Sequence, residues 1–511
     1  MLTSDRIPSP ARESFREALR DTQGYRVDGM ERRPAFITHL GRTVKQRRLD
    51  VRALPMVPRP AAREGTVAMA AHRLAQDSTS SVDLVQQALE VVRRRDPELN
   101  AFVHVAPERE LLQQARALDR ERAIGQARGP LHGIPVSIKD VIHVKGMPTT
   151  CSSKAMPHYV PERDATTVAG LREAGAIIMG KTQTHEFALG VTTPQSRNPW
   201  DTTRDPGGSS GGSAISVATG MSLLGLGTDT RASIRVPAAL CGIVGYKPTY
   251  GLVSTDGIIT LSWSMDHAGL HGRTVEDVAL MMNAVQGEDD RDPASLDRPK
   301  DDYTQYLFRD VRGLRVGLAA NGVRGVAPDV LRAFNEGVTA LRGLGVQIVE
   351  TEVPSAEDIR LATALGLIVS RCEAAAFHRA FPNAGPLYTP EVFEQLDEAN
   401  QVKAVDYLTA QRFRSEFSER MLKHLEGFDA LLMPTSRVTA PKVEESGRYI
   451  MILSENCIPW SFIGFPALSV PCGLSPAGLP VGAQLVAAPF EDGVLMALAS
   501  ALESMTPDRR P

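Results

Sequence analysis

Three segments of the sequence carry side chains that could together perform acyl transfer. The first, Gly129–Asp140, is an apolar run that ends at Lys139. Burial disfavours an ammonium group and lowers its pKa, so a lysine at the end of a buried strand could act as a neutral general base. The alternative is an ion pair between Lys139 and a buried carboxylate, and this segment alone leaves both interpretations open.

The other two segments supply hydroxyl groups. Gly207–Gly212 reads Gly-Gly-Ser-Ser-Gly-Gly and contains Ser209 and Ser210, and Gly225–Ala238 forms a turn around Ser233. Consecutive backbone N–H groups at such a turn could point at one oxygen and stabilise the oxyanion of a tetrahedral intermediate. An anion nest that holds a structural carboxylate is the alternative interpretation of this turn.

Read together and in this order, the segments resemble the amidase signature family. The resemblance rests on Gly-Gly-Ser-Ser-Gly-Gly-Ser, followed by Asp-Thr-x-x-Ser-Ile-Arg-x-Pro with Ser233 as its serine. It extends from about Thr66 almost to the C-terminus and leaves the first 65 residues unexplained. The stretches that agree with the family are 129–150, 175–187, 197–249, 264–269, 428–434 and 464–489.

The resemblance implies a Ser-Ser-Lys catalytic triad. Ser233 would be the acyl nucleophile, Ser209 the bridging serine held by a cis peptide bond, and Lys139 the base. A bridging hydroxyl suits this role because it both donates and accepts a hydrogen bond. The remaining implied residues are the oxyanion-hole amides of Thr230, Arg231, Ala232 and Ser233, and the supporting side chains of Asp229, Arg235 and Ser210.

The sequence departs from the family pattern at the oxyanion turn, where Arg231-Ala232 replaces the usual Gly-Gly. If either position required a positive φ, a side chain would cost about 1 kcal/mol or more and the turn would be rearranged. We expect Arg231 to face solvent, although its guanidinium could instead project toward a substrate carboxylate. The short loop 190–197, and Ser461–Ile463 in place of the frequent Asn-Leu-Thr, are expected to line the acyl pocket.

Two other motifs would indicate different enzyme classes. Gly175–Thr182 matches the phosphate-binding string G-x-x-x-x-G-K-[ST], but the apolar run between its glycines reads as a strand rather than a phosphate cradle. Ser209 and Ser210 also satisfy G-x-S-x-G, but the polar loop 197–206 precedes them where a nucleophile elbow needs a buried strand. We therefore favour neither a nucleotide hydrolase nor an α/β-hydrolase.

Composition and motif content exclude several partners. The 57 Lys+Arg and 60 Asp+Glu residues give a net charge of −3, which provides no broad attraction to nucleic acid or an anionic membrane. There is no H-E-x-x-H motif, and His267 and His271 flank a loop-like stretch, so we expect no metal site, and the family resemblance implies no cofactor. The five scattered cysteines favour a reducing compartment. A soluble, cytoplasmic protein that acts on a small-molecule amide fits these features.

The pattern of apolar residues predicts an α/β fold. Short apolar runs at 134–138, 176–179 and 430–433 alternate with helical segments such as 166–174. A capping-box signal at Ser80–Asp83 precedes a helical stripe of Val82, Val85, Leu89 and Val92. Taken with the resemblance, this predicts one large amidase-signature domain over 66–511, with a mixed central β-sheet flanked by helices.

Residues 1–65 are expected to form a helical N-terminal extension. Short helices are expected at 12–22 and 34–48, followed by a proline-rich linker at 55–60. These helices could pack on the catalytic body or on a second protomer, so the sequence is compatible with a homodimer. The alternative interpretation of this segment is a partly ordered tail.

The leading functional interpretation is an amidohydrolase that cleaves the C–N bond of a carboxylic amide, or of a related carbamate or urea, through an acyl-enzyme intermediate. One alternative is a glutamine-hydrolysing A-type subunit of an amidotransferase. Another is an inactive amidase-like binding or scaffold protein, which the intact Lys139, Ser209 and Ser233 disfavour and Arg231-Ala232 leaves open.

Overall fold

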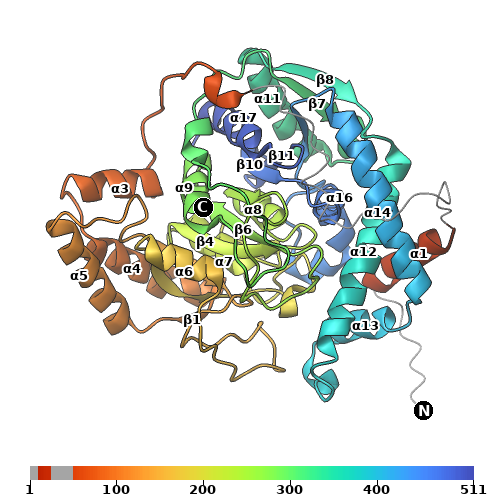
Figure 1. The fold of residues 1–511 in the computed structure, drawn as a ribbon, viewed down its shortest axis with the longest axis horizontal. Helices are drawn as coiled ribbons and strands as arrows, with labels where there is room; N and C mark the ends of the chain where they lie inside the picture. Colours follow the sequence, from red (N-terminus) through yellow and green to blue (C-terminus); the bar gives the residue numbers. More distant parts are fainter. Residues whose placement is uncertain (1–9, 25–49) are drawn as a thin grey trace.

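The computed structural model describes residues 10–24 and 50–511 and arranges them around an 11-stranded sheet (Figure 1). The strand order is β1-β3-β2-β4-β6-β5-β10-β11-β9-β7-β8. Strands β2, β3 and β4 pair in parallel, whereas β4, β6, β5, β10 and β11 pair antiparallel, which confirms the predicted mixed sheet. The strands are β1 (Phe102–Val105), β2 (Pro135–Lys139), β3 (Ile177–Thr182), β4 (Leu224–Asp229), β5 (Val244–Lys247), β6 (His267–Gly272), β7 (Arg315–Ala319), β8 (Gln347–Thr351), β9 (Ala430–Pro434), β10 (Ala467–Leu474) and β11 (Pro480–Val486).

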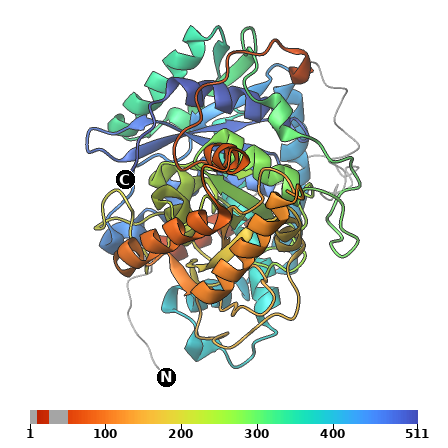
Figure 2. The same ribbon diagram turned by 90° about the vertical axis from the view of Figure 1, so that its left-hand side faces the viewer.

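Helices flank this sheet, as the sequence predicts. Helices α12 and α14 pack together along one side of the molecule, whereas α4 and α5 pack together on the opposite side (Figures 1 and 2). The helices are α1 (Pro10–Gly24), α3 (Val67–Ala75), α4 (Ser81–Leu99), α5 (Glu108–Ala123), α6 (Thr166–Glu173), α7 (Gly211–Thr219), α8 (Arg235–Cys241), α9 (Val275–Val285), α10 (Ala320–Val323), α11 (Pro328–Gly343), α12 (Ala356–His378), α13 (Pro390–Ala399), α14 (Ala404–Leu425), α15 (Ile450–Ser454), α16 (Ile458–Phe462) and α17 (Asp492–Met505).

Helix α4 forms where the capping-box signal predicts it. The Ser80 side chain accepts from the Asp83 N–H, and the Asp83 carboxylate accepts from the Ser80 N–H, so two backbone donors at the helix start are satisfied. Val85, Leu89 and Val92 are buried along the predicted stripe. The apolar face therefore holds α4 against the body, with its polar face in solvent.

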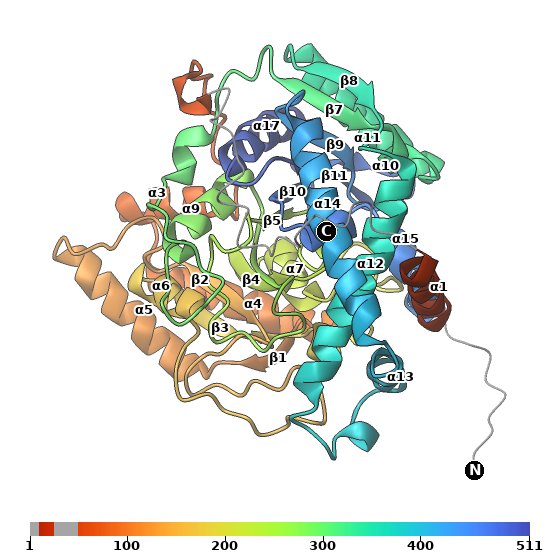
Figure 3. The same cartoon turned by 45° about the vertical axis from the view of Figure 1, so that its right-hand side comes forward.

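The N-terminal extension contributes helix α1, which confirms the helix expected at 12–22. It packs against α12 and α14 (Figure 3). Phe15 is 2% exposed, and together with Ala18 it joins the apolar cluster formed by those helices. The second expected helix, at 34–48, lies outside the described residues, and the boundary at 65/66 stays a prediction.

Two stretches considered above, the phosphate-binding string Gly175–Thr182 and His267–His271, both contribute to strands of the sheet. Lys181 and Thr182 of the phosphate-binding string lie within β3, where Lys181 forms an ion pair with Asp140 at 3.2 Å. The loop-like interpretation of His267–His271 is wrong, because both residues lie in β6, which pairs with β4 and β5. Gly269 suggested a loop, but it lies in the strand, where a Cβ would come within 2.2 Å of the Ile234 side chain.

Three further observations concern membrane spans, cysteines and metal ligands in the part of the chain that the structure describes. None of the helices in this part of the chain is long and apolar enough to cross a membrane. All five cysteines are free thiols. Within residues 10–24 and 50–511, no group of three or more His, Cys, Asp or Glu side chains gathers to form a metal site.

Candidate active site

Lys139 is the last residue of β2, a strand that lies between β3 and β4 inside the sheet. Its side chain is fully buried, at 0% exposure. Its Nζ donates hydrogen bonds to Ser209 Oγ and to Thr228 Oγ1, both at 2.7 Å. The end of β2 thus places the Lys139 amine within hydrogen-bond distance of two hydroxyl groups, which come from separate segments of the chain.

The surroundings of Lys139 favour a neutral amine. Burial lowers its pKa to about 7, although the charges of Asp266 and Asp229 oppose this shift. The ion-pair alternative is not realised, because no carboxylate of the described residues lies within 4.0 Å of the Lys139 amine. Near neutral pH a substantial fraction of Lys139 can therefore accept a proton.

The glycine-serine loop places Ser209 between β2 and the start of α7, and its Gly208–Ser209 peptide bond is cis. The loop is tightly packed, because a Cβ at Gly208 would approach the backbone oxygen of Thr192 to 2.1 Å. The Ser209 carbonyl accepts from the His185 N–H at 3.2 Å. These contacts fix the hydroxyl of Ser209 beside Lys139.

Ser210 connects this loop to the second serine turn. Its N–H donates to the Ser233 carbonyl at 3.2 Å, and its hydroxyl donates to the Thr228 carbonyl at 3.1 Å. These two hydrogen bonds of Ser210 link the glycine-serine loop to the turn around Ser233, and its supporting role stays a prediction.

Ser233 lies in the turn between β4 and α8 and is nearly buried. Within the described chain, the amides of Thr230, Arg231, Ala232 and Ser233 donate to no protein acceptor. Turn amides without a protein partner can bind an oxyanion. The structure joins Lys139 to Ser209, but none of the hydrogen bonds in this part of the chain connects the hydroxyls of Ser209 and Ser233.

Asp229 and Arg235 hold the two ends of the Ser233 turn. Arg235 donates to both carboxylate oxygens of Asp229, at 2.9 and 3.0 Å, and to the Arg231 carbonyl at 3.1 Å. Burial alone would raise the pKa of Asp229, but Arg235 reverses the effect and keeps that pKa below its usual range. Ser461 joins the pair, since its hydroxyl donates to Asp229 at 3.0 Å.

Arg231 differs from the expectation. Neither it nor Ala232 is among the non-glycine residues of the described chain with positive φ, so the turn accepts both side chains without the cost considered above. The expectation that Arg231 faces solvent is wrong, because it is only 4% exposed. Glu391 of α13 and Arg371 of α12 lie close enough to act electrostatically on Arg231, and these distant helices could not be placed from the local sequence.

Two residues of this region received no role from the sequence. Thr228 is part of the motif around Ser233, yet its contact with Lys139 depends on the pairing of β2 with β4. Asp266 accepts a hydrogen bond from the Thr230 hydroxyl at 2.6 Å, and burial raises the pKa of its carboxyl group. The only available signal for either was its position inside or beside a recognised family segment.

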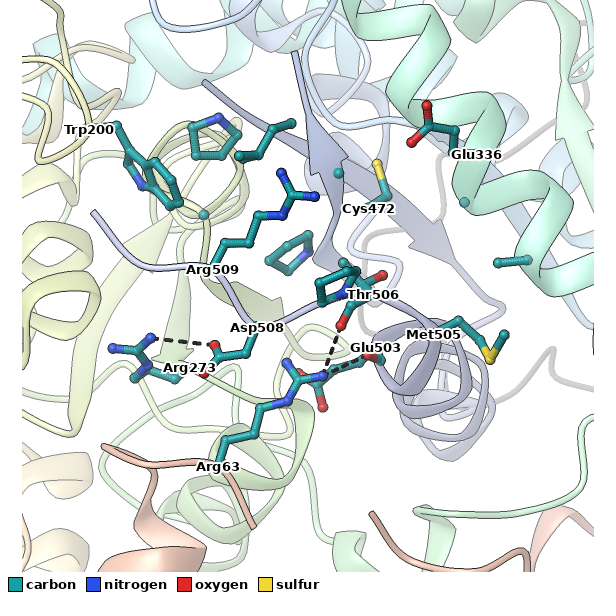
Figure 4. Close-up of a pocket in the computed structure, with 18 residues that line it drawn as sticks. Arg63, Trp200, Arg273, Glu336, Cys472, Glu503, Met505, Thr506, Asp508 and Arg509 are labelled. Atoms are coloured by element: carbon teal, nitrogen blue, oxygen red, sulfur yellow. Dashed lines mark hydrogen bonds and ion pairs between the residues drawn. The ribbon is translucent and has the colours of Figure 1, made fainter. Parts of the chain in front are cut away.

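A separate cavity of about 390 Å³ lies away from these residues, beside α11, α17 and the C-terminal tail (Figure 4). Arg63 donates to the backbone oxygens of Glu503 and Thr506, at 2.9 and 3.0 Å, and Arg273 lies 3.7 Å from Asp508. These contacts attach the tail to the body. The lining of this cavity contains neither Lys139 nor the two serines.

Comparison with known proteins places the chain in a family. The amidase family model matches residues 83–496. The A-type subunit of glutamyl-tRNA(Gln) amidotransferase from Chloroflexus aggregans is 38% identical over 87% of this chain and 98% of its own.

Two solved structures are also similar. Native peptide amidase from Stenotrophomonas maltophilia is 32% identical, with a TM-score of 0.76 over 89% of this chain and 99% of that chain. The second is an inhibitor-bound structure, which is 29% identical to this chain. It concerns a vestigial protein complex that reveals the evolutionary origins of an s-triazine catabolic enzyme. It has a TM-score of 0.81 over 86% of this chain and 98% of that chain. The sequence family model and the shared fold together establish that the chain belongs to the amidase signature family.

Proposed function

We propose that this chain is an amidohydrolase that cleaves the C–N bond of a carboxylic amide through an acyl-enzyme intermediate. One observation carries the proposal: the fully buried Lys139 donates to Ser209 at 2.7 Å and has no carboxylate partner among the described residues. An uncompensated amine is costly to keep charged in the interior, which suits a base that works in its neutral form.

The proposed reaction begins at Ser233. Its hydroxyl proton passes to Ser209 while the Ser209 proton passes to Lys139, and Ser233 Oγ forms a bond to the carbonyl carbon. The amides of the turn 230–233 bind the resulting oxyanion. The proton then returns to the amide nitrogen, the C–N bond breaks and the amine leaves, after which water cleaves the ester by the same route. Carbamates and ureas can enter the same sequence, and no step uses a cofactor.

The second candidate is the glutamine-hydrolysing, A-type subunit of an amidotransferase. The name of the Chloroflexus aggregans relative supports this candidate more directly than a stand-alone amidase. The N-terminal extension and Arg231-Ala232, which replaces the Gly-Gly usual in the family, favour the first candidate. In the second case the chain would work with partner subunits, and in the first it would act alone or as a homodimer.

A turnover assay with size measurement separates the candidates. Purified chain is incubated with aliphatic amides, aryl amides, carbamates and glutamine, and released ammonia or amine is measured alongside gel filtration. We expect turnover of at least one simple amide by the chain alone, loss of it in Ser233→Ala, and full activity in the exposed-site control Ser504→Ala. Turnover restricted to glutamine and dependent on added partner subunits would establish the second candidate instead.

The third interpretation, an inactive binding or scaffold protein, predicts no turnover and no reaction of Ser233 with an electrophilic phosphonate.

We also propose residues 66–511 as the catalytic domain, with the extension that precedes them as a supporting element. The cytoplasmic location expected from the cysteine pattern is part of the same proposal.

A further inference from the structure

Arg231 occupies an unusual position for a cation. It lies two residues before Ser233 and is almost completely buried. In the described chain its guanidinium has no hydrogen bond to a protein group and no carboxylate within 4.0 Å. A buried arginine usually has a carboxylate partner, because the loss of hydration is otherwise uncompensated.

The charges around Arg231 do not neutralise it by direct contact. Burial lowers its pKa to about 10, although the charge of Glu391 opposes this shift. A second buried cation, Arg371 of α12, lies near enough that repulsion from Arg231 helps burial to lower its own pKa to about 9. Glu398 lies 4.0 Å from Arg371, and His185 lies 3.8 Å from Glu391. The region therefore brings two guanidinium groups close to each other, and in the described chain no acid lies within 4.0 Å of Arg231.

Helix α13, which carries Glu391, is hydrogen-bonded to the segment 186–189. Thr389, the residue before α13, donates to Glu186 through its N–H and its hydroxyl, at 2.8 and 2.6 Å. Gln395 donates to the Leu189 carbonyl at 3.0 Å. These contacts hold α13 close to the segment that precedes the glycine-serine loop, so the environment of Arg231 is built by packed elements.

We propose that Arg231 binds a carboxylate of the substrate, so that the chain acts on amides that carry a carboxylate group. This inference rests on the proposed function and specifies its substrate class. A planar guanidinium can hold a carboxylate through two parallel hydrogen bonds, which fixes orientation as well as position. The location of Arg231 beside Ser233 couples that orientation to the attacked carbonyl. Arg371 adds positive potential to the same region.

The alternative is that Glu391 serves as the internal counterion of Arg231. The separation of more than 4.0 Å between them argues against a formed ion pair. The two possibilities make opposite predictions: an internal counterion would make the site indifferent to ligand charge, whereas a substrate site would prefer an anionic ligand.

The test uses ligand pairs of matched shape. Binding of glutaric acid monoamide and of pentanamide is measured by calorimetry on Ser233→Ala, which removes turnover, and again after addition of Arg231→Gly, Arg231→Gln or Arg231→Lys. We expect the carboxylate-bearing amide to bind about 30-fold tighter than the neutral one, a ratio within the range of charge-assisted hydrogen bonds. Arg231→Gly and Arg231→Gln should remove the preference, and Arg231→Lys should retain part of it.

Hydrolysis by the wild-type chain separates this inference from the proposed function. Equal binding of both ligands, or a preference that survives Arg231→Gly and Arg231→Gln, overturns the carboxylate site even if both amides are hydrolysed. A preference that depends on Arg231 without hydrolysis of either amide supports the site and counts against the proposed function. Failure of both ligands to bind overturns the carboxylate site as well.

Discussion

The amine nitrogen of Lys139 lies 2.7 Å from the hydroxyl oxygen of Thr228, so the proposed base has an acceptor besides Ser209. This contact orients the amine across two parallel strands, β2 and β4, and leaves Ser209 as the group through which a proton could reach it. In the proposed mechanism Thr228 is thus a positioning residue, because it would act through Lys139.

Thr228→Val keeps the shape of the side chain and removes the acceptor. We expect kcat/KM to fall by about 10- to 100-fold, because the amine loses its fixed orientation. The pH at which activity is half-maximal should also decrease, since loss of an acceptor disfavours the ammonium form. A pH profile checks both effects, with Thr339→Val on α11 as the exposed control. A simple loss of folding would lower activity without moving the profile.

The pH dependence of kcat/KM in the wild-type chain should follow the protonation of Lys139, the proposed base. Because the pKa of Lys139 is lowered to about 7 and the proposed active form is the neutral amine, kcat/KM should rise with pH through about 7 and then level off. Lys139→Met should abolish turnover, whereas Lys145→Met, at an exposed site, should leave the profile unchanged. A flat profile between pH 5 and 9, taken as about two units either side of this pKa, would contradict the neutral-amine mechanism.

The buried pair Asp229–Arg235 should determine stability more than chemistry. Asp229→Asn leaves the guanidinium of Arg235 without its charged partner and is expected to reduce the free energy of unfolding by about 3–5 kcal/mol. Asp201→Asn removes a surface partner of Arg204 and should cost about 0–1 kcal/mol. Denaturant titration of both variants provides the comparison, and equal costs would refute the bracing role.

Removal of the Glu391 charge should strengthen anion binding. The Glu391 carboxylate lies in the field of Arg231 and Arg371, so Glu391→Gln leaves a more positive region. We expect glutaric acid monoamide to bind about 3- to 10-fold tighter, while the affinity for pentanamide is unchanged. Asp397→Asn, at an exposed position of the same helix, is the matched control. Weaker binding in Glu391→Gln would instead indicate that Glu391 contacts the ligand.

Helix α1 should stabilise α12 against local unfolding. Phe15 is buried between α1 and its neighbours, and the Arg371 guanidinium lies 4.6 Å from the centre of its ring. Phe15→Ala is expected to cost about 3 kcal/mol of local stability and to increase amide exchange in α1 and the middle of α12. Glu17→Ala, on the exposed side of α1, should leave exchange unchanged. Unaltered protection in Phe15→Ala would mean that α1 does not stabilise this region.

The sequence predicts the parts of the structure that depend on local pattern. Residue type and spacing are enough to predict three elements: the capping box before α4, the strand that ends at Lys139, and the strand formed by the phosphate-binding string. The mixed sheet and its helices follow from the alternation of apolar runs together with the family resemblance.

What the sequence does not predict depends on contacts between distant segments. The contact of Thr228 with Lys139 requires the register of two strands, and the burial of Arg231 beside Arg371 and Glu391 requires helices more than a hundred residues away in the chain. His267–His271 reads as a loop because Gly269 weakens strand character, yet pairing with strands on both sides makes it a strand.

The most direct measurement is reaction with a fluorophosphonate followed by mass mapping of the labelled peptide. We expect a single adduct on Ser233 in the wild-type chain, strongly reduced in Ser209→Ala and absent in Lys139→Met, with Ser504→Ala labelled normally. An adduct on Ser209 or Ser210 instead of Ser233, or undiminished labelling of Ser233 without Lys139, would contradict the proposed relay from Lys139 through Ser209.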